Sequence, residues 1–188
     1  MESKRIRTRT YTMTGIALMA AIMCMIGPIS IPIGVVPITL TDFVIYSSVY
    51  LLGSKCGTIS YIVYLMLGVF GLPVFSGYSG GIAKLAGPTG GYLIGFIFMA
   101  LSSGCIIERC KYQFAISVFG LSFSTLIAYL FGTIWFVAQA DCGFLYALTI
   151  CVFPFLIGDF IKILIVAWIC PLIRKQLSRN GLLVSKKK

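Results

Sequence analysis

Long runs of apolar residues, interrupted by short groups of polar, glycine and proline residues, dominate the sequence. Six runs are candidate spans, at about 11–27, 42–53, 57–72, 88–107, 113–138 and 154–173. A helix that spans a membrane upright needs roughly 20 residues. The run at 42–53 is shorter, so we expect it to begin nearer Pro37 or to stay partly buried in the bundle. The pattern predicts an all-α bundle of six transmembrane helices.

The region 142–173 is too long for a single span. Pro154 divides it, because proline cannot continue a helix but is well tolerated in the first turn of one. We therefore predict a short interfacial helix at about 143–151 and a last span that begins at Pro154.

The composition places the chain in a membrane. Hydrophobic residues make up 59% of it, charged residues 11%, and the mean hydropathy is +1.02. Soluble domains carry about 25% charged residues, and a small globule has too little interior for so much apolar surface. The run Met13–Ile26 passes into Gly27-Pro28 without the small residues of a signal-peptide cleavage site, so we expect it to remain as the first span.

The basic residues predict the topology. If the N-terminus is cytoplasmic, all but two of the 15 lysine and arginine residues fall on the inner side, and the exceptions are Lys84 and Lys162. This asymmetry favours six spans in one membrane domain, 1–188, with both termini inside and basic cytoplasmic tails at 1–10 and 174–188. Because the net charge of +10 is concentrated near the ends, we interpret it as contact with anionic lipid rather than nucleic-acid binding.

The cysteines do not form a metal-binding pattern. Seven are present without a CxxC pair, and the chain has no histidine. We therefore interpret them as small buried hydrophobic residues and expect no metal site.

Asp159 and Lys162 stand within the apolar stretch PFLIGDFIKILIVA (154–167). Each charge at the centre of a membrane span costs roughly 2.5–3.5 kcal/mol on insertion scales. A spacing of three residues puts both on one helix face. One interpretation is a local salt bridge that lowers this cost, and the other is a ligand-binding site.

Two segments on the predicted outer side are irregular. Residues 27–42 are apolar and contain three prolines, which indicates either a lid over a pocket or a stiff linker in the headgroup region. Residues 71–96 hold eight of the 20 glycines and favour a pocket wall lined by backbone, with Tyr78 and Tyr92 as flat surfaces. With one carboxylate and one ammonium, such a pocket suits a small flat or bicyclic ligand that carries N–H donors and an anionic group. The spacing Gly91-x-x-x-Gly95 also suits close helix packing.

Four motifs in order along the chain resemble the BioY family, the biotin-binding S components of energy-coupling factor (ECF) transporters. They are VPITL (36–40), GLPVFSG (71–77), GPTGGYLIGF (87–96) and PFLIGDFIK (154–162). The resemblance implies a multi-pass protein of a prokaryotic cell membrane with the ECF S-component fold. It would capture biotin as a transported substrate, use no cofactor, and depend on a transmembrane coupling subunit and two ABC-type ATPases for import.

The resemblance also implies residue roles. Asp159 would bind the ureido ring, Lys162 the valerate carboxylate, and the 28–41 loop would cover the pocket. Ala17 and Ala21, a small-xxx-small pair, would dock against the coupling subunit, although packing within the bundle is the alternative. The chain departs from the family at Thr41, where a glutamine is usual, and at Tyr78, within what is commonly a Gly-Gly step. Further ligand contacts would be Ser79, Tyr92, Gly91, Val36 and Thr39.

Other functions remain open at this point. An S component for another small vitamin is the nearest alternative. A membrane enzyme would need a histidine–nucleophile pair, a metal cluster or paired carboxylates, which the sequence does not indicate. A channel would need polar residues along successive spans. The sequence also lacks the GxxxxGK[ST] motif, so we expect no ATPase activity in this chain.

Overall fold

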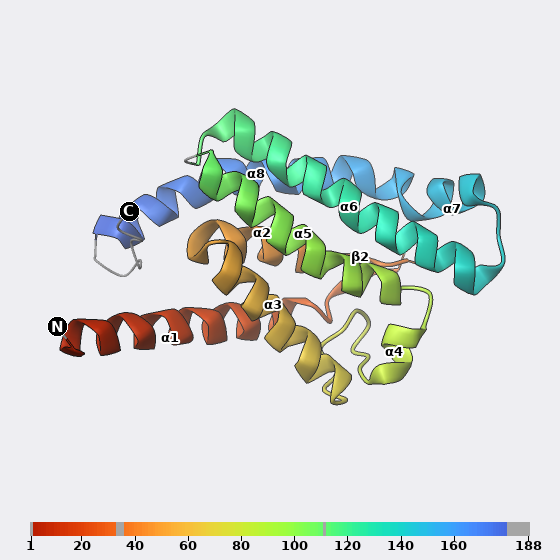
Figure 1. The fold of residues 1–188 in the computed structure, drawn as a ribbon. Helices are drawn as coiled ribbons and strands as arrows, with labels where there is room; N and C mark the ends of the chain where they lie inside the picture. The colour runs from red at the N-terminus through yellow and green to blue at the C-terminus, as the bar shows by residue number, and fades with distance from the viewer. Residues whose placement is uncertain (1, 33–35, 111, 180–188) are drawn as a thin grey trace.

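The structure, a computed structural model, describes residues 2–32, 36–110 and 112–179. Its core is a bundle of six helices, with a β-hairpin and two short helices at the end away from the chain termini (Figure 1). In chain order the elements are α1 (Glu2–Ile26), β1 (Ser30–Ile31), β2 (Ile38–Thr39), α2 (Thr41–Leu52), α3 (Ser54–Val69), α4 (Ile82–Ala86), α5 (Gly90–Arg109), α6 (Phe114–Ala140), α7 (Phe144–Cys151) and α8 (Phe153–Arg179).

The predicted all-α bundle is confirmed, but fewer of its helices than the six predicted spans are long enough to cross a membrane. Four segments are long and apolar enough to cross a membrane: Arg9–Ile26, Gly90–Arg109, Phe114–Ala140 and Phe153–Arg179. The helices α2 and α3 are apolar but have only 12 and 16 residues. Nine of the residues of α2 are buried, as its short length predicted, but it begins at Thr41 rather than nearer Pro37.

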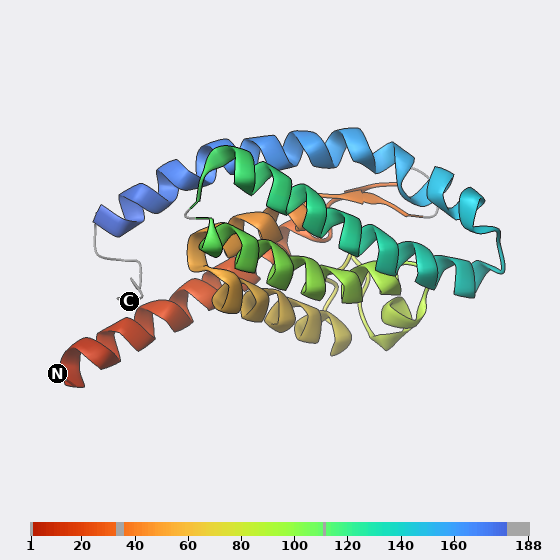
Figure 2. The same cartoon turned by 45° about the horizontal axis from the view of Figure 1, so that its top comes forward.

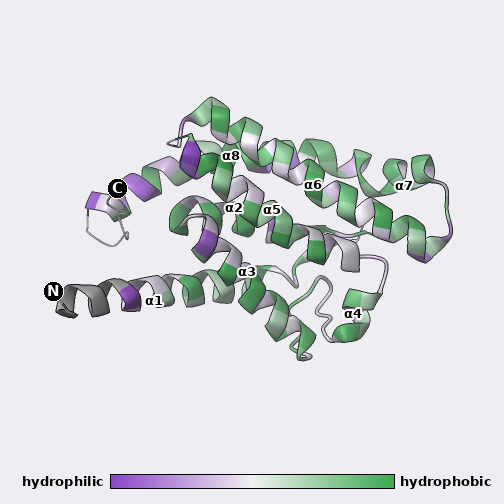
Figure 3. Cartoon of the chain, in the orientation of Figure 1, coloured by the Kyte–Doolittle hydropathy of each residue, from purple (hydrophilic) through white to green (hydrophobic). Residues whose placement is uncertain are grey.

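Hydropathy follows the architecture. Apolar residues run along the helices, and most hydrophilic residues lie at the end of the molecule that carries both termini (Figure 3). Large apolar side chains such as Phe119, Leu126 and Trp168 are exposed on the outside of the bundle, as expected for surfaces that face lipid. The protein is therefore a multi-pass membrane protein.

Two boundaries correct the sequence predictions. Residues 2–10 continue α1 and do not form a separate tail. The last helix extends to Arg179, past the predicted end at 173, and it passes through Pro171. The predicted tail at 174–188 therefore starts inside α8, and residues 180–188 lie outside the described part. The short helix predicted at 143–151 is present as α7, and Pro154 is the second residue of α8, where its missing N–H costs no helical hydrogen bond.

Glycines set the closest helix contacts. An added Cβ atom at Gly91 or Gly95 of α5 would collide with Trp135 or crowd Phe131 and Ala128 of α6, so these glycines let the two helices approach closely. Gly53 alone joins α2 to α3 and has a φ of +87°, a conformation that glycine adopts without strain.

Side chains from other helices satisfy the helix ends at this junction. Glu108 of α5 accepts a hydrogen bond from the Ser54 N–H at 2.6 Å, at the start of α3. Arg174 of α8 donates to the carbonyls of Tyr50 and Leu51, at 2.7 and 2.8 Å, in the last turn of α2. The Arg174 guanidinium also lies 4.0 Å from the ring centroid of Tyr112. The α2 C-terminus is thus capped by a cation from α8.

The irregular segment 27–42 forms an antiparallel hairpin. Ser30 of β1 pairs with Thr39 of β2, and Ile31 pairs with Ile38. Figure 2 shows this hairpin alongside α8, at the end of the bundle opposite the termini. Residues 33–35, in the middle of the segment predicted to cover a pocket, lie outside the described residues. The described residues 27–32 and 36–40 are not helical, as expected for this segment.

Candidate ligand-binding pocket

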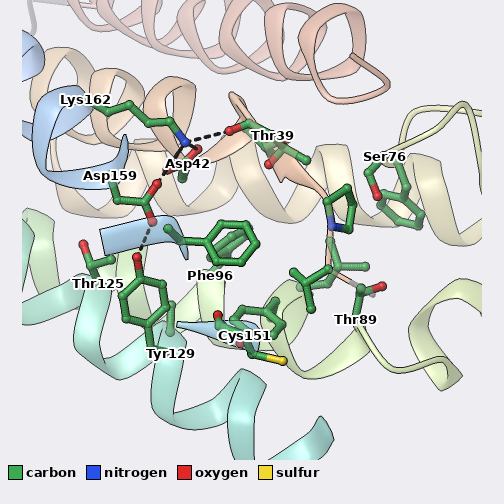
Figure 4. Close-up of a pocket in the computed structure, with 18 of the residues that line it drawn as sticks. Thr39, Asp42, Ser76, Thr89, Phe96, Thr125, Tyr129, Cys151, Asp159 and Lys162 are labelled. Atoms are coloured by element: carbon green, nitrogen blue, oxygen red, sulfur yellow. Dashed lines mark hydrogen bonds and ion pairs between the residues drawn. The ribbon is translucent and has the colours of Figure 1, made fainter. Parts of the chain in front are cut away.

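A pocket lies between the hairpin and the helices α2, α3, α5, α6 and α8. The space among its lining residues, including the part open to solvent, is about 760 Å³. The side chains of Lys162, Asp42 and Asp159 gather at one side of it, and Ser76 and Thr89 lie at the other (Figure 4). Phe96 lies between these two sides (Figure 4). The lining also includes further apolar and aromatic residues: Val36, Tyr92, Leu93, Ala128 and Phe155.

Lys162 is the centre of the charged side. Its Nζ atom donates to Asp159 Oδ1 at 2.9 Å, and to the two carboxylate oxygens of Asp42 at 3.0 and 2.9 Å. It also donates to the Thr39 carbonyl of β2 at 2.7 Å. The lysine therefore joins α8, α2 and the hairpin, and it is matched by two carboxylates rather than one.

Both carboxylates of the cluster are buried, and a tyrosine hydroxyl binds one of them. Asp42 is 5% and Asp159 8% exposed. Tyr129 of α6 donates to Asp159 Oδ2 at 2.5 Å, so both oxygens of this carboxylate already accept hydrogen bonds. Asp42 is in the first turn of α2, where the positive end of the helix dipole stabilises a negative charge. With two carboxylates and one ammonium, the cluster has an excess of acceptor oxygens, which favours N–H donors on a ligand.

Tyr92 forms part of the pocket wall, as the sequence analysis expected. Its ring lines the pocket, and its hydroxyl donates to the Cys151 carbonyl at 3.1 Å, which fixes the ring against the end of α7. An added Cβ at Gly132 of α6 would collide with this ring, so the glycine provides the space that the ring occupies. Close packing and this hydrogen bond therefore set the position of the Tyr92 ring in the wall.

The glycine-rich loop contributes differently from the prediction. Tyr78 is 71% exposed and does not line the pocket. Its φ of +55° places it at the tip of a tight turn closed by hydrogen bonds between Phe75 and Ser79. Ser79 is also outside the lining; its hydroxyl donates to the Ser76 carbonyl at 2.8 Å, while Ser76 itself lines the pocket. Ser79 thus holds the turn that presents Ser76.

The structure brings together most of the predicted ligand-binding residues. Asp159, Lys162, Tyr92, Val36 and Thr39 all line the pocket. Gly91 does not, because it faces α6 at Trp135 and the Phe131 carbonyl.

Sequence reasoning missed two residues of the charged side, Asp42 and Tyr129. The expected site with one carboxylate and one ammonium is wrong in this respect, because Asp42 adds a second carboxylate. A signal for Asp42 was available: it is one of only five acidic residues, and it stands at the edge of an apolar run. Tyr129 is one aromatic residue within a continuous apolar span, and the sequence gives no sign of its partner.

The predicted docking residues Ala17 and Ala21 are exposed on α1 and contribute nothing to the pocket. Among cysteines, Cys151 and Cys170 are buried, whereas Cys105 is exposed, so the expectation of general burial is only partly met. In the described part of the chain, no three acidic or cysteine side chains are placed to hold a metal ion.

Comparison with known proteins gives the family. The model of the BioY family matches residues 1–179. The chain belongs to the BioY family. A probable biotin transporter BioY of Pyrococcus horikoshii is 39% identical over 147 residues, which cover 78% of this chain and 86% of the relative. The biotin transporter BioY of Lactococcus lactis subsp. cremoris is 35% identical over 182 residues, covering 93% and 94%.

A solved structure supports the same relationship. This BioY chain is similar, with a TM-score of 0.82 and 33% identity, to a crystal structure of the S-component for biotin from an ECF-type ABC transporter. The match covers 94% of this chain and 95% of the other. Its fold is therefore that of an ECF S component.

Proposed function

We propose that this chain captures biotin at the outer face of the cell membrane of a prokaryote, as the S component of an ECF-type uptake transporter. The proposal rests on the pocket of this BioY chain, which has a charged cluster on one side and hydroxyl groups on the other. The charged side offers carboxylate oxygens of Asp42 and Asp159 to N–H groups, and a ureido ring has two such groups. The apolar middle suits the sulfur-containing ring and the methylene chain of biotin.

The residues have distinct roles in this proposal. Asp159 accepts from the ureido ring, and Lys162 holds the Asp42 and Asp159 carboxylates in place. Tyr92 and Val36 pack against the ligand, and the hairpin with Thr39 covers it. Ser79 and Gly91 act indirectly, the first by shaping the turn at Ser76 and the second by setting the distance between α5 and α6.

We also propose how the chain works with partners. It has no GxxxxGK[ST] motif, so energy for import would come from two ABC-type ATPase subunits through a transmembrane coupling subunit. Ala17 and Ala21 are exposed four residues apart on α1, where small side chains permit close approach of another helix. The chain would form one membrane domain with both termini in the cytoplasm, supported by the basic residues at that end.

The test is a binding experiment on the chain purified in detergent. Biotin, riboflavin and thiamine are titrated separately by calorimetry, and thermal unfolding is followed with each. We expect biotin alone to bind tightly and to raise the unfolding temperature, because a ligand that binds only the folded state stabilises it. Equal stabilisation by all three vitamins, or by none, would contradict the proposal. Stabilisation by one of the other two would indicate an S component for that vitamin.

A further inference from the structure

Lys162 has little capacity left for an anionic ligand. An ammonium has three N–H donors, and the Lys162 Nζ already donates to Asp42, Asp159 and the Thr39 carbonyl. The two carboxylates overcompensate its single charge. A ligand carboxylate that approached Lys162 would be repelled by Asp42 and Asp159, or would have to displace one of them.

A second cation lines the same pocket. Lys84 of α4 is half-buried, and its ammonium forms no hydrogen bond or ion pair with any residue that the structure describes. Lys84 and Lys162 are also the two basic residues that fall outside the inner side in the predicted topology. Both lysines that depart from the positive-inside pattern therefore line one pocket. Of the two, Lys84 is the one whose ammonium has no partner among the described residues, so it is available to bind a ligand.

Lys84 belongs to a different element from the residues of the charged cluster, the short helix α4 that precedes Thr89. The Lys84 carbonyl accepts from the Gly87 N–H at 3.3 Å, two residues before Thr89, and Trp135 Nε1 donates to the Gly87 carbonyl at 3.0 Å. The backbone of α4 is thus fixed beside Thr89. Figure 4 places Thr89 and Ser76 on the side of the pocket away from Lys162 and Asp159. Lys84 lines the same pocket as Ser76 and Thr89.

We infer that Lys84, with the hydroxyls of Ser76 and Thr89, binds the carboxylate of the ligand, while Lys162 orders the carboxylates that bind the opposite end. The inference rests on the proposed function, because biotin carries its carboxylate at the end of a methylene chain, away from the ureido ring. The ligand then lies across the apolar middle of the pocket, with N–H groups at Asp159 and the anion at Lys84. Lys84 is in this sense the residue that selects for an acid over a neutral analogue.

The experiment compares biotin with its uncharged methyl ester on the purified full chain in detergent. The wild type should bind biotin about 10- to 150-fold more tightly than the ester, the range for losing one charge-assisted hydrogen bond. Lys84→Met should weaken biotin binding by a similar factor and leave ester binding unchanged, so the preference disappears. Lys84→Arg should retain most of the preference. Lys55→Met, which removes an exposed lysine at the other end of the bundle, is the matched control and should bind both ligands as the wild type does.

The outcomes separate the inference from the proposed function. A wild type that does not bind biotin refutes the proposed function and the inference with it. A wild type that prefers biotin, with that preference intact in Lys84→Met, refutes the inference alone. The inference is also refuted if Lys162→Met, and not Lys84→Met, abolishes the preference. Thermal unfolding of each variant shows whether it is folded, and the ester titration shows whether its pocket is intact.

Discussion

Lys162 of α8 and Asp42 of α2 form a buried ion pair, with Nζ 2.9 Å from Oδ2, although the two residues are 120 positions apart in the sequence. Asp159 shares the same ammonium from one turn away on α8. The pair Asp159–Lys162 had two interpretations, a local salt bridge and a ligand site, and both now concern the same cluster of side chains. The salt bridge exists, but it is part of a larger network that lines the pocket.

The first prediction concerns Lys162→Met. The substitution leaves two buried carboxylates without a cation, and removing one partner of a buried ion pair costs about 3–5 kcal/mol. We expect a large fall in the unfolding temperature in detergent without ligand. Replacing all three residues, as Asp42→Asn, Lys162→Met and Asp159→Asn together, should recover most of that stability because no unpaired charge remains. A triple variant no more stable than Lys162→Met would contradict the role of Lys162 as the compensating charge.

The second prediction separates stability from recognition. Asp159→Asn keeps the shape of the side chain but loses a charged acceptor, so biotin affinity should fall by about 10- to 150-fold. Asp141→Asn is the matched control, since Asp141 is exposed at the end of α6 in a left-handed conformation that asparagine tolerates. Calorimetric titration measures both. Native affinity in a folded Asp159→Asn variant would remove this carboxylate from the proposed site.

The sequence was sufficient for the parts of the fold that depend on local pattern. Hydropathy runs predicted the six helices of the bundle, four of which are long enough to cross a membrane, and Pro154 predicted the boundary between α7 and α8. Boundaries that depend on tertiary contacts were missed. For example, α8 continues past Pro171 to Arg179, and Arg174 in this extension caps α2. The extension of α8 past Pro171 therefore makes a contact with a segment far away in the sequence, which a local sequence pattern does not indicate.

The candidate site was predictable to the same extent. Asp159 and Lys162 are conspicuous because charges are costly in an apolar run, whereas Asp42 and Tyr129 became recognisable only as their partners in space. Lys84 was visible in sequence as the one basic residue in the outer loops, but its place in the pocket follows from the packing of α4 beside α5. For Tyr78 the prediction was wrong in the other direction. The residue was expected to line the pocket, but it lies in the glycine-rich turn and its ring is exposed outside the pocket.

The third prediction concerns Arg174→Gln. The variant loses two charge-assisted hydrogen bonds to the last carbonyls of α2 and the contact with the Tyr112 ring. We expect the free energy of unfolding to fall by about 2–4 kcal/mol, in line with hydrogen bonds to charged groups. Lys175→Gln removes the exposed neighbouring cation and should change it by less than about 0.5 kcal/mol. Chemical unfolding of the two variants, each compared with the wild type, distinguishes a capping residue from a general effect of positive charge.

The fourth prediction tests the outward face of α1. Ala17→Trp and Ala21→Trp should each reduce biotin uptake in cells that contain the coupling and ATPase subunits, because the added bulk prevents close helix approach. Biotin binding to the purified variants should stay within about twofold of the wild type, since both residues lie outside the pocket. Leu126→Trp, on the exposed face of α6, is the control for bulk at a lipid-facing position. Normal uptake by both alanine variants would exclude this face from docking.

The two attachments of α2 to α8 restrict how the bundle can rearrange. Asp42 holds the first turn of α2 to Lys162, and the carbonyls of Tyr50 and Leu51 hold its last turn to Arg174. Axial sliding of one helix past the other would break bonds at both ends at once, so we expect α2 and α8 to move together. We then expect any shear motion in the bundle to take place between this pair and the elements opposite it, which are α5, α6 and the segment that carries Lys84.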